Sequence, residues 1–495
     1  MLFNSLEYMI FLPVVLAVYY IIPDKLKPAW LLICSYFFYM CWNAVYALLI
    51  LFSTAATYLC ALLLERARAS EGNKDRRLEK LSLALCLVLN LGILFYFKYF
   101  NFAITSINEV LAGCGFAFSC PTFDIVLPVG ISFYTFQALG YTIDVYRSEI
   151  YAEKSFLRYA LFVSFFPQLV AGPIERSKNL LKQLAVPKKA DFNTMREGVL
   201  LILWGFFLKV VLSDRIAIFV DTVYGDSAAY GGWYTIIATL LFAVQIYCDF
   251  GGYSTIAVGS AKMLGVELME NFNTPYLSMS TAEFWRRWHI SLSTWFRDYV
   301  YIPLGGNRKG KERKYLNIMI TFGLSGLWHG AQWTYVFWGL LNGFYQVIGD
   351  MLKPLRDWGV KTFDLHRDSL GHKTVKVLVT FMLINFAWVF FRAPQLSDAF
   401  DMLRGAFTAA NPWILFDGSL YECGLDRPNF DLMLAGIALL IGADICKYRG
   451  IKLRELIVKQ DAWCQSLVIA LSVSLILLFG IFGGNEAANF IYFQF

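Results

Sequence analysis

A short segment in the second half of the chain reads Gly323-Leu-Ser-Gly-Leu-Trp-His329-Gly-Ala-Gln-Trp333. It lies inside the apolar run 317–351, which is long enough for two helical segments that enter the membrane and return as a hairpin. A helix that starts near Leu316 rises about 20 Å to His329, which places the imidazole well inside a bilayer core about 30 Å thick. An ionisable side chain at that depth indicates a functional site, and the alternative is a structural histidine packed between glycine-rich helices.

The composition indicates the class of protein. The chain has 495 residues, of which 58% are hydrophobic, 17% aromatic and 16% charged. Soluble domains carry about a quarter charged residues, and disordered chains have few aromatic residues, so both classes are excluded. We therefore predict an all-α polytopic membrane protein surrounded by the lipid bilayer. The net charge of +6 does not indicate a nucleic-acid partner, because the surplus Lys and Arg of membrane proteins collect in cytoplasmic loops.

Candidate spans are apolar runs, and they cover residues 6–22, 29–42, 44–64, 81–100, 125–146, 156–171, 199–212, 233–248, 317–351, 374–391, 431–446 and 463–482. Pro128 interrupts one of the shorter runs and Pro167 another, so we expect non-helical backbone sheltered inside the protein. Basic loops mark the cytoplasmic side, and they are 65–80, 173–198, 305–314, 352–373 and 447–459. We predict a single membrane domain over residues 1–495, with a cytosol-facing amphipathic or re-entrant insert at 249–316.

The sequence offers few residues for catalysis. It has no P-loop, GxGxxG, HExxH or GxSxG motif and no His/Cys cluster with metal-ligand spacing, so the common nucleotide, zinc and serine-hydrolase sites are excluded. No Asp or Glu stands near the middle of a candidate span. Of the four histidines, His366 and His372 lie in a charged loop, where solvated side chains are expected. His289 and His329 remain as candidate catalytic residues.

His289 stands in a segment of interleaved aromatic and basic residues, 284–299. We predict one amphipathic helix there, with Trp285, Trp288 and His289 on one face and Arg286 pointing elsewhere. An interfacial anchor at the headgroups is one interpretation. The other is a cytosolic vestibule in which cations attract an anionic donor and indole rings stack on a planar group. The candidate substrate-binding residues are Trp285, Arg286, Trp288, Arg297, Asp298 and Trp328.

The C-terminal tail, 484–495, ends in the aromatic run Phe490-Ile-Tyr492-Phe-Gln-Phe495. An interfacial anchor is the simple account of such a run. The extended chain from Gly483 to Tyr492 spans about 30 Å, so the tail is also long enough to fold back toward a histidine in the membrane. A phenol beside such a base is a candidate transient acyl acceptor, because deprotonation makes it a competent nucleophile.

These residues belong to a longer series of motifs, which read Leu127-Pro-Val-Gly-Ile-Ser-Phe-Tyr134, Ile143-Asp-Val-Tyr-Arg147, Phe166-Pro167, Ala171-Gly-Pro173, Tyr247-Cys-Asp-Phe-Gly-Gly-Tyr253, Met269-Glu-Asn-Phe272, Glu283-Phe-Trp-Arg-Arg-Trp-His289 and Leu327-Trp-His-Gly-Ala331. In this series the chain resembles the membrane-bound O-acyltransferase (MBOAT) family. It is most similar to the bacterial branch that contains the membrane subunit of alginate O-acetylation. The resemblance runs in order from Met1 to at least Tyr345.

The resemblance implies a ring of about 11–13 transmembrane and re-entrant helices around a central tunnel, with His329 at its centre and His289 toward the cytosol. It implies acetyl-CoA as the acyl donor substrate, approaching from the cytosol, with no bound cofactor and no metal. In the related D-alanylation system a separate small peptide ends in an F-x-Y-x-x-F pattern whose Tyr is thought to carry the acyl group. The tail of this chain is similar to that pattern and contains it as Phe490-x-Tyr492-x-x-Phe495.

We therefore expect a multi-pass O-acetyltransferase of the inner (cytoplasmic) cell membrane, with His329, His289 and Tyr492 as catalytic residues. His329 would accept the proton of the attacking hydroxyl, and an indole N–H such as that of Trp328 would steady the oxyanion. The acetyl group would pass through Tyr492 to an extracytoplasmic partner that has its own serine nucleophile. That partner would modify a secreted or cell-wall polysaccharide, whose identity the sequence leaves open.

Two other functions stay open at this point. A D-alanyl transferase of teichoic acid would use an acyl-carrier-protein thioester as donor, although the fused aromatic tail and the longer chain favour the acetyl branch. A transporter would use His329 as a proton relay. The lack of apparent inverted repeats, and of acidic residues near the middle of a span, argues against transport.

Overall fold

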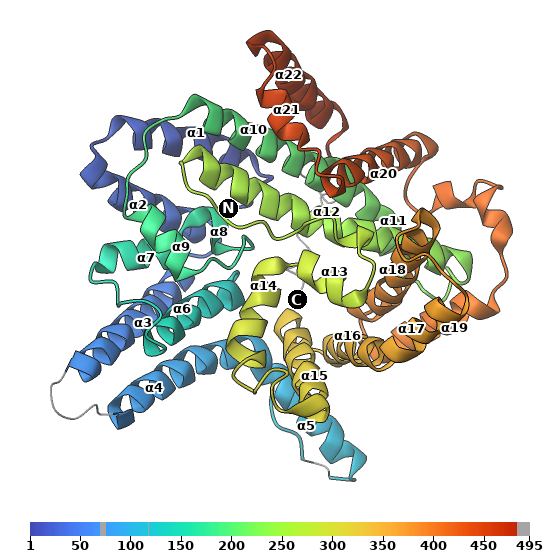
Figure 1. Ribbon diagram of the computed structural model, residues 1–495, viewed down its shortest axis with the longest axis horizontal. Coiled ribbons are helices and arrows are strands. Elements are labelled where there is room, and N and C mark those ends of the chain that lie inside the picture. Colours follow the sequence, from blue (N-terminus) through green and yellow to red (C-terminus); the bar gives the residue numbers. More distant parts are fainter. Residues whose placement is uncertain (70–75, 117, 483–495) are drawn as a thin grey trace. The chain divides into compact units, whose positions relative to one another are not determined.

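The computed structural model describes residues 1–69, 76–116 and 118–482, and every regular element in these residues is helical (Figure 1). Within the described residues, six continuous helical stretches are long and apolar enough to cross a membrane, and they are Tyr46–Arg68, Arg77–Gly113, Trp233–Met263, Leu370–Arg392, Arg427–Tyr448 and Ala462–Phe479. The prediction of an all-α, multi-pass membrane protein is therefore confirmed. The ring around a central tunnel stays a prediction.

The backbone divides into two compact units. The first consists of Met1–Val199 and Ala257–Met269, and the second consists of Leu200–Ile256 and the residues that follow Met269. Two helices, α10 (Phe192–Phe206) and α12 (Trp233–Met263), contribute residues to both units. The single membrane domain expected over residues 1–495 and its insert at 249–316 stay predictions.

The first unit contains nine helices among its described residues, which are α1 (Leu6–Ile21), α2 (Lys27–Met40), α3 (Tyr46–Ala69), α4 (Arg76–Leu94), α5 (Phe100–Gly113), α6 (Ile131–Tyr146), α7 (Phe156–Ser164), α8 (Phe166–Leu169) and α9 (Ser177–Leu184). The expected interruptions are present. Gly130 takes the left-handed conformation that directs the chain into α6, and Phe165 separates α7 from α8. At that break the N–H of Phe166 donates to the hydroxyl of Ser35 at 3.1 Å, so a side chain replaces the missing helical acceptor.

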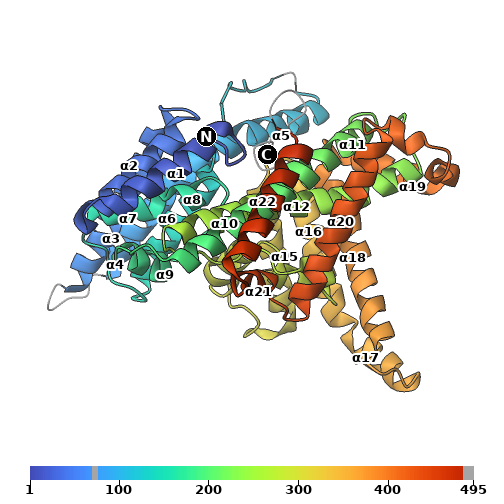
Figure 2. The same ribbon diagram turned by 90° about the horizontal axis from the view of Figure 1, so that it is seen from above.

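The second unit holds the remaining helices of the described residues, which are α11 (Asp214–Gly225), α13 (Thr281–Arg287), α14 (Ile290–Phe296), α15 (Gly310–His329), α16 (Trp333–Met351), α17 (Lys353–Thr362), α18 (Leu370–Arg392), α19 (Leu396–Thr408), α20 (Arg427–Tyr448), α21 (Leu453–Val458) and α22 (Ala462–Phe479). The helices α15 and α16 form the hairpin expected over 317–351, and α18 packs against α16. In Figure 2, α17 lies at the end of α18. Helix α13 packs against both α16 and α18, which brings the His289 segment to the hairpin.

A buried group of three charged side chains corrects the expectation that no acidic residue lies near the middle of a span. The ammonium of Lys209 is 2.8 Å from the carboxylate of Asp214 and 2.6 Å from that of Asp249. The three side chains are at most 4% exposed. The expected span ended at Cys248, but α12 continues to Met263 and so carries Asp249 near its middle. The helix continues through this carboxylate because Lys209 neutralises it there.

Replacing Lys209 by Met should strongly destabilise the second unit, because two carboxylates would then be buried without their shared cation. We expect the free energy of unfolding to fall by about 3–5 kcal/mol. Lys262→Met is the matched control, since Lys262 pairs with Glu197 where both side chains are partly exposed. Thermal unfolding of the purified variants in detergent measures both effects, and equal losses in the two variants would contradict the expectation.

Candidate active site

His329 is the last residue of α15 and points into a cluster of aromatic rings. Its side chain is 2% exposed. The imidazole centroid lies 5.1 Å from the ring of Trp328, 5.1 Å from that of Trp338 and 5.5 Å from that of Phe391, all in edge-to-face geometry. The three rings come from α15, α16 and α18, so the packing of these helices fixes the position of the imidazole.

The glycines around His329 bring backbone against backbone. A Cβ atom on Gly326 would lie 2.2 Å from the carbonyl oxygen of Tyr335, and one on Gly339 would lie 2.9 Å from the Cα of Gly326. A Cβ atom on Gly330 would meet the ring of Tyr335 at 2.1 Å. Only glycine allows this approach without displacing a backbone. The glycines flanking the histidine therefore serve helix packing.

His289 lies between two short helices, which corrects the prediction of one amphipathic helix over 284–299. Helix α13 ends at Arg287, Trp288 is extended, and His289 is left-handed with φ 42° and ψ 55°. A left-handed backbone is uncommon for a residue other than glycine. It turns the chain into α14, so Trp285, Trp288 and His289 do not share one helical face.

The structure places the two predicted catalytic histidines side by side. The ring centroids of His289 and His329 are 6.2 Å apart, and the indole of Trp328 lies 5.7 Å from His289. The ring of Phe250 contacts His289 edge-on at 4.6 Å. Burial among apolar groups disfavours the charged form of an imidazole, so we expect the ring of His289 to be neutral.

Among the expected substrate-binding residues, the three tryptophans are packed into the protein. Trp288 is 1% exposed and contacts the rings of Phe272, Phe284 and Trp388 at 4.9–5.4 Å. The indole N–H of Trp285 donates to the side-chain oxygen of Asn342 at 3.3 Å. Trp328 is buried beside both histidines. Trp285 and Trp288 contact other aromatic rings, whereas Trp328 borders the imidazole pair. The predicted contact of the three tryptophans with a substrate stays a prediction.

The expected charged residues lie at the surface. Arg286 is exposed, and Arg297 is exposed and forms an ion pair with the neighbouring Asp298 at 2.7 Å. Neither arginine is buried with the histidines. Their proposed contact with a donor stays a prediction, and Tyr492 lies outside the described residues together with the tail 484–495.

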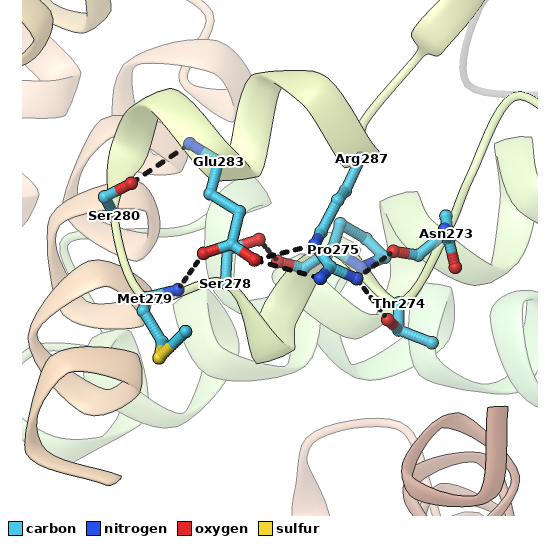
Figure 3. Close-up of polar contacts among 8 residues, drawn as sticks. All are labelled: Asn273, Thr274, Pro275, Ser278, Met279, Ser280, Glu283 and Arg287. Atoms are coloured by element: carbon cyan, nitrogen blue, oxygen red, sulfur yellow. Dashed lines mark hydrogen bonds and ion pairs between the residues drawn. The ribbon is translucent and has the colours of Figure 1, made fainter. Parts of the chain in front are cut away.

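A polar brace around α13 was not anticipated (Figure 3). The guanidinium of Arg287 donates to the carboxylate of Glu283 at 2.9–3.0 Å, to the carbonyl oxygen of Asn273 at 3.2 Å and to the hydroxyl of Thr274 at 3.0 Å. The second carboxylate oxygen of Glu283 accepts the N–H of Met279 at 2.9 Å. These contacts tie the start and end of α13 to the preceding segment.

The sequence does carry a signal for one half of this brace. Ser280 and Glu283 form the Ser-x-x-Glu pattern of a helix start, and the N–H of Glu283 donates to the Ser280 hydroxyl at 3.1 Å. Glu283 and Arg287 also have the i, i+4 spacing of an ion pair on one helix. The other partners of Arg287, Asn273 and Thr274, come from the segment before the helix, where no local pattern indicates them. Among residues 1–69, 76–116 and 118–482, no group of three or more His, Cys, Asp or Glu is arranged to hold a metal ion.

Comparisons with known proteins show the family of this chain. The sequence model of the MBOAT, membrane-bound O-acyltransferase family, matches residues 147–391, which include both histidines. The chain is 39% identical over 443 residues to the probable alginate O-acetylase AlgI of Pseudomonas aeruginosa, covering 89% of this chain and 80% of that protein. It is 31% identical to the peptidoglycan O-acetyltransferase of Helicobacter pylori, covering 100% of this chain and 98% of that protein.

A third relative is the teichoic acid D-alanyltransferase of Streptococcus thermophilus, which is 29% identical over 276 residues, covering 52% of this chain and 65% of that protein. The chain belongs to the membrane-bound O-acyltransferase family. It is a multi-pass membrane enzyme that transfers an acyl group to a hydroxyl oxygen.

Gly326→Ala should destabilise the hairpin, because the added Cβ atom would collide with the carbonyl of Tyr335. We expect a loss of about 1–3 kcal/mol in the free energy of unfolding. Gly349→Ala on α16 is the control, since a Cβ atom there meets no atom within 4 Å and Ala should stabilise the helix by about 0.5–1 kcal/mol. Thermal unfolding should thus move in opposite directions, and a shift of the same sign in both variants would refute the steric argument.

Arg287→Ala should cost about 1–3 kcal/mol of unfolding free energy, because Glu283, Asn273 and Thr274 would lose a charged donor. Arg286→Ala, at the preceding position of the same helix, should change the free energy of unfolding by less than about 0.5 kcal/mol, because Arg286 is exposed. Chemical or thermal unfolding of the two variants distinguishes loss of the brace contacts from a general effect of removing a positive charge. Similar stabilities of the two variants would show that the brace does not contribute.

Proposed function

We propose that this enzyme takes an acetyl group from cytosolic acetyl-CoA and relays it across the cell membrane for O-acetylation of a secreted or cell-wall polysaccharide. The observation that carries the proposal is the pair of buried imidazoles 6.2 Å apart, inside the part of the chain that matches the family. The activities named for the alginate and peptidoglycan relatives support polysaccharide O-acetylation. The inner (cytoplasmic) membrane is the location that gives access to both substrates.

In the proposed first step, the hydroxyl of Tyr492 attacks the thioester carbonyl carbon of the donor. His329 accepts the hydroxyl proton as the C–O bond forms, and the C–S bond breaks when the tetrahedral adduct collapses. The proton held by His329 then passes to the leaving thiolate, so the imidazole returns to its neutral form. A thioester is already activated, so positioning and exclusion of water supply much of the rate.

The environment of the histidines supports this assignment of roles. Trp328 borders both imidazoles, so its indole N–H is a candidate to hydrogen-bond the oxyanion. His289 lies opposite and, as a neutral ring, would orient the reacting hydroxyl or carbonyl. Arg286 is the exposed cation next to the histidine segment, and with the Arg297–Asp298 pair it would meet the anionic part of the donor.

The second half of the proposed pathway lies outside this chain. The acetyl ester on Tyr492 would be attacked by the serine nucleophile of an extracytoplasmic partner, and that partner would transfer the group to the polysaccharide. The D-alanyl alternative has weaker support, because the teichoic acid relative matches 52% of this chain whereas the peptidoglycan O-acetyltransferase matches 100%.

Incubation of the purified protein with radiolabelled acetyl-CoA tests the relay directly. We expect label on the wild-type polypeptide that hydroxylamine releases, as it does from an aryl ester. Label should fall to background in Tyr492→Phe, which lacks the acceptor, and in His329→Ala, which lacks the base. His366→Ala is the control, because His366 is exposed in a charged loop.

The outcomes divide the alternatives. Label that persists in Tyr492→Phe would exclude Tyr492 as the carrier, and label that persists in His329→Ala would exclude this imidazole as the base. A wild-type protein that takes label from a D-alanyl carrier-protein thioester and not from acetyl-CoA would favour the teichoic acid reaction. Loss of label in His366→Ala would indicate a nonspecific effect of the substitutions.

A further inference from the structure

One residue, Asn271, binds two consecutive backbone N–H groups next to His289. The N–H of Ile290 donates to the main-chain oxygen of Asn271 at 3.0 Å, and the N–H of Ser291 donates to its side-chain Oδ1 at 3.2 Å. Asn271 is 2% exposed, so water does not compete for these bonds. The first N–H groups of α14 have no helical acceptor of their own, and Asn271 supplies acceptors for two of them from a distant position in the sequence.

These bonds matter because His289 has a left-handed backbone. Such a conformation is unfavourable for a side chain with a Cβ atom and persists only where the surroundings enforce it. The backbone angles at His289 set the direction of its Cα–Cβ bond and hence the position of the imidazole. If the residue relaxed to the right-handed region, its ring would leave the site beside His329.

The segment that carries Asn271 is itself held on both sides. The ammonium of Lys447 on α20 is 2.9 Å from the carboxylate of Glu270 and donates to the main-chain oxygen of Phe272 at 3.4 Å. On the other side the N–H of Asn273 donates to the main-chain oxygen of Arg287 at 2.9 Å. Helix α20 lies beyond the residues that match the family, yet it fixes the segment that holds His289.

We propose that Asn271 is a positioning residue for acyl transfer, which holds His289 in its left-handed conformation and thereby keeps the two imidazoles side by side. This inference rests on the proposed function for its kinetic consequence. Asn271 itself does not touch the reacting atoms in this assignment. Its side-chain oxygen acts through the Ser291 N–H, and its main-chain oxygen acts through the Ile290 N–H.

The test uses the full-length protein with Asn271→Ala, Asn271→Asp and Asn273→Ala. Alanine removes the acceptor for Ser291, whereas aspartic acid keeps an oxygen at the same place. Asn273→Ala is the matched control, because that side chain is exposed and its main-chain bonds survive the change. Asn271→Ser replaces the alanine variant if the latter does not fold, since its shorter side chain stays polar but does not reach the Ser291 N–H.

Two readouts are measured on each variant. The first is the rate of labelling by radiolabelled acetyl-CoA as a function of donor concentration. We expect Asn271→Ala to lower the maximal rate by about 10–100-fold with an unchanged half-saturating concentration, and Asn271→Asp to restore most of it. The second is amide hydrogen exchange in the peptide 288–293, which should be faster in Asn271→Ala and unchanged in Asn273→Ala.

A wild-type labelling rate in Asn271→Ala would overturn the inference. A labelling rate in Asn271→Asp as low as that of Asn271→Ala would also overturn it, because the acceptor oxygen would then not be responsible for the effect. Failure of the proposed function is a separate result. If the wild-type protein takes no label, the acetyl relay on this chain is refuted, and hydrogen exchange alone decides the positioning role. Unchanged exchange at residues 290 and 291 in Asn271→Ala would then overturn it, and faster exchange would support it.

Discussion

Where α15 and α16 meet, two glycines let the helix backbones approach more closely than any side chain would allow. A Cβ atom on Gly339 would lie 2.4 Å from the carbonyl oxygen of Phe322, and one on Gly326 would lie 2.2 Å from that of Tyr335. Helix α15 ends at His329 near this crossing, and the ring of Trp338 on α16 packs against the His329 imidazole. Backbone contact is stiff, so the packing of the helices holds the imidazole in place.

The two histidines reach neighbouring positions by different physical means. His329 is placed by helix packing, whereas His289 is placed by hydrogen bonds that stabilise an unfavourable backbone conformation. Acyl transfer from a thioester depends on positioning and on the exclusion of water, and both arrangements keep the rings buried. The rings of Trp328 and Phe391 are among the aromatic groups that line the pair, with Trp328 beside His289 and Phe391 beside His329.

Carboxylates inside the helices of this protein have local partners. Lys209 lies between the buried Asp214 and Asp249, and the phenol of Tyr247 donates a hydrogen bond to the half-buried carboxylate of Asp444 at 3.1 Å. An ionisable residue in a membrane helix is by default a candidate for ion or proton transport. Because Asp249 is paired with Lys209, its place in α12 adds no support for transport, and the family match shows that the chain is an acyltransferase.

Composition and motif order by themselves determined the class of fold, the family and the choice of His289 and His329 as candidate site residues. The length of apolar runs and the rarity of ionisable residues within them can be read from the sequence alone, and a lipid bilayer constrains both strongly. The breaks at Gly130 and Phe165 were also predictable, since Gly and Pro act on their own backbone. Only the tertiary structure decided that the segment around His289 is two helices joined by a left-handed residue. The oxygens of Asn271, and those of Asn273 and Thr274 that accept from Arg287, come from another segment, and a periodic pattern within 284–299 contains no information about them. Helical periodicity predicts which residues would share a face of a helix. Where that helix ends depends on hydrogen bonds from residues distant in the sequence.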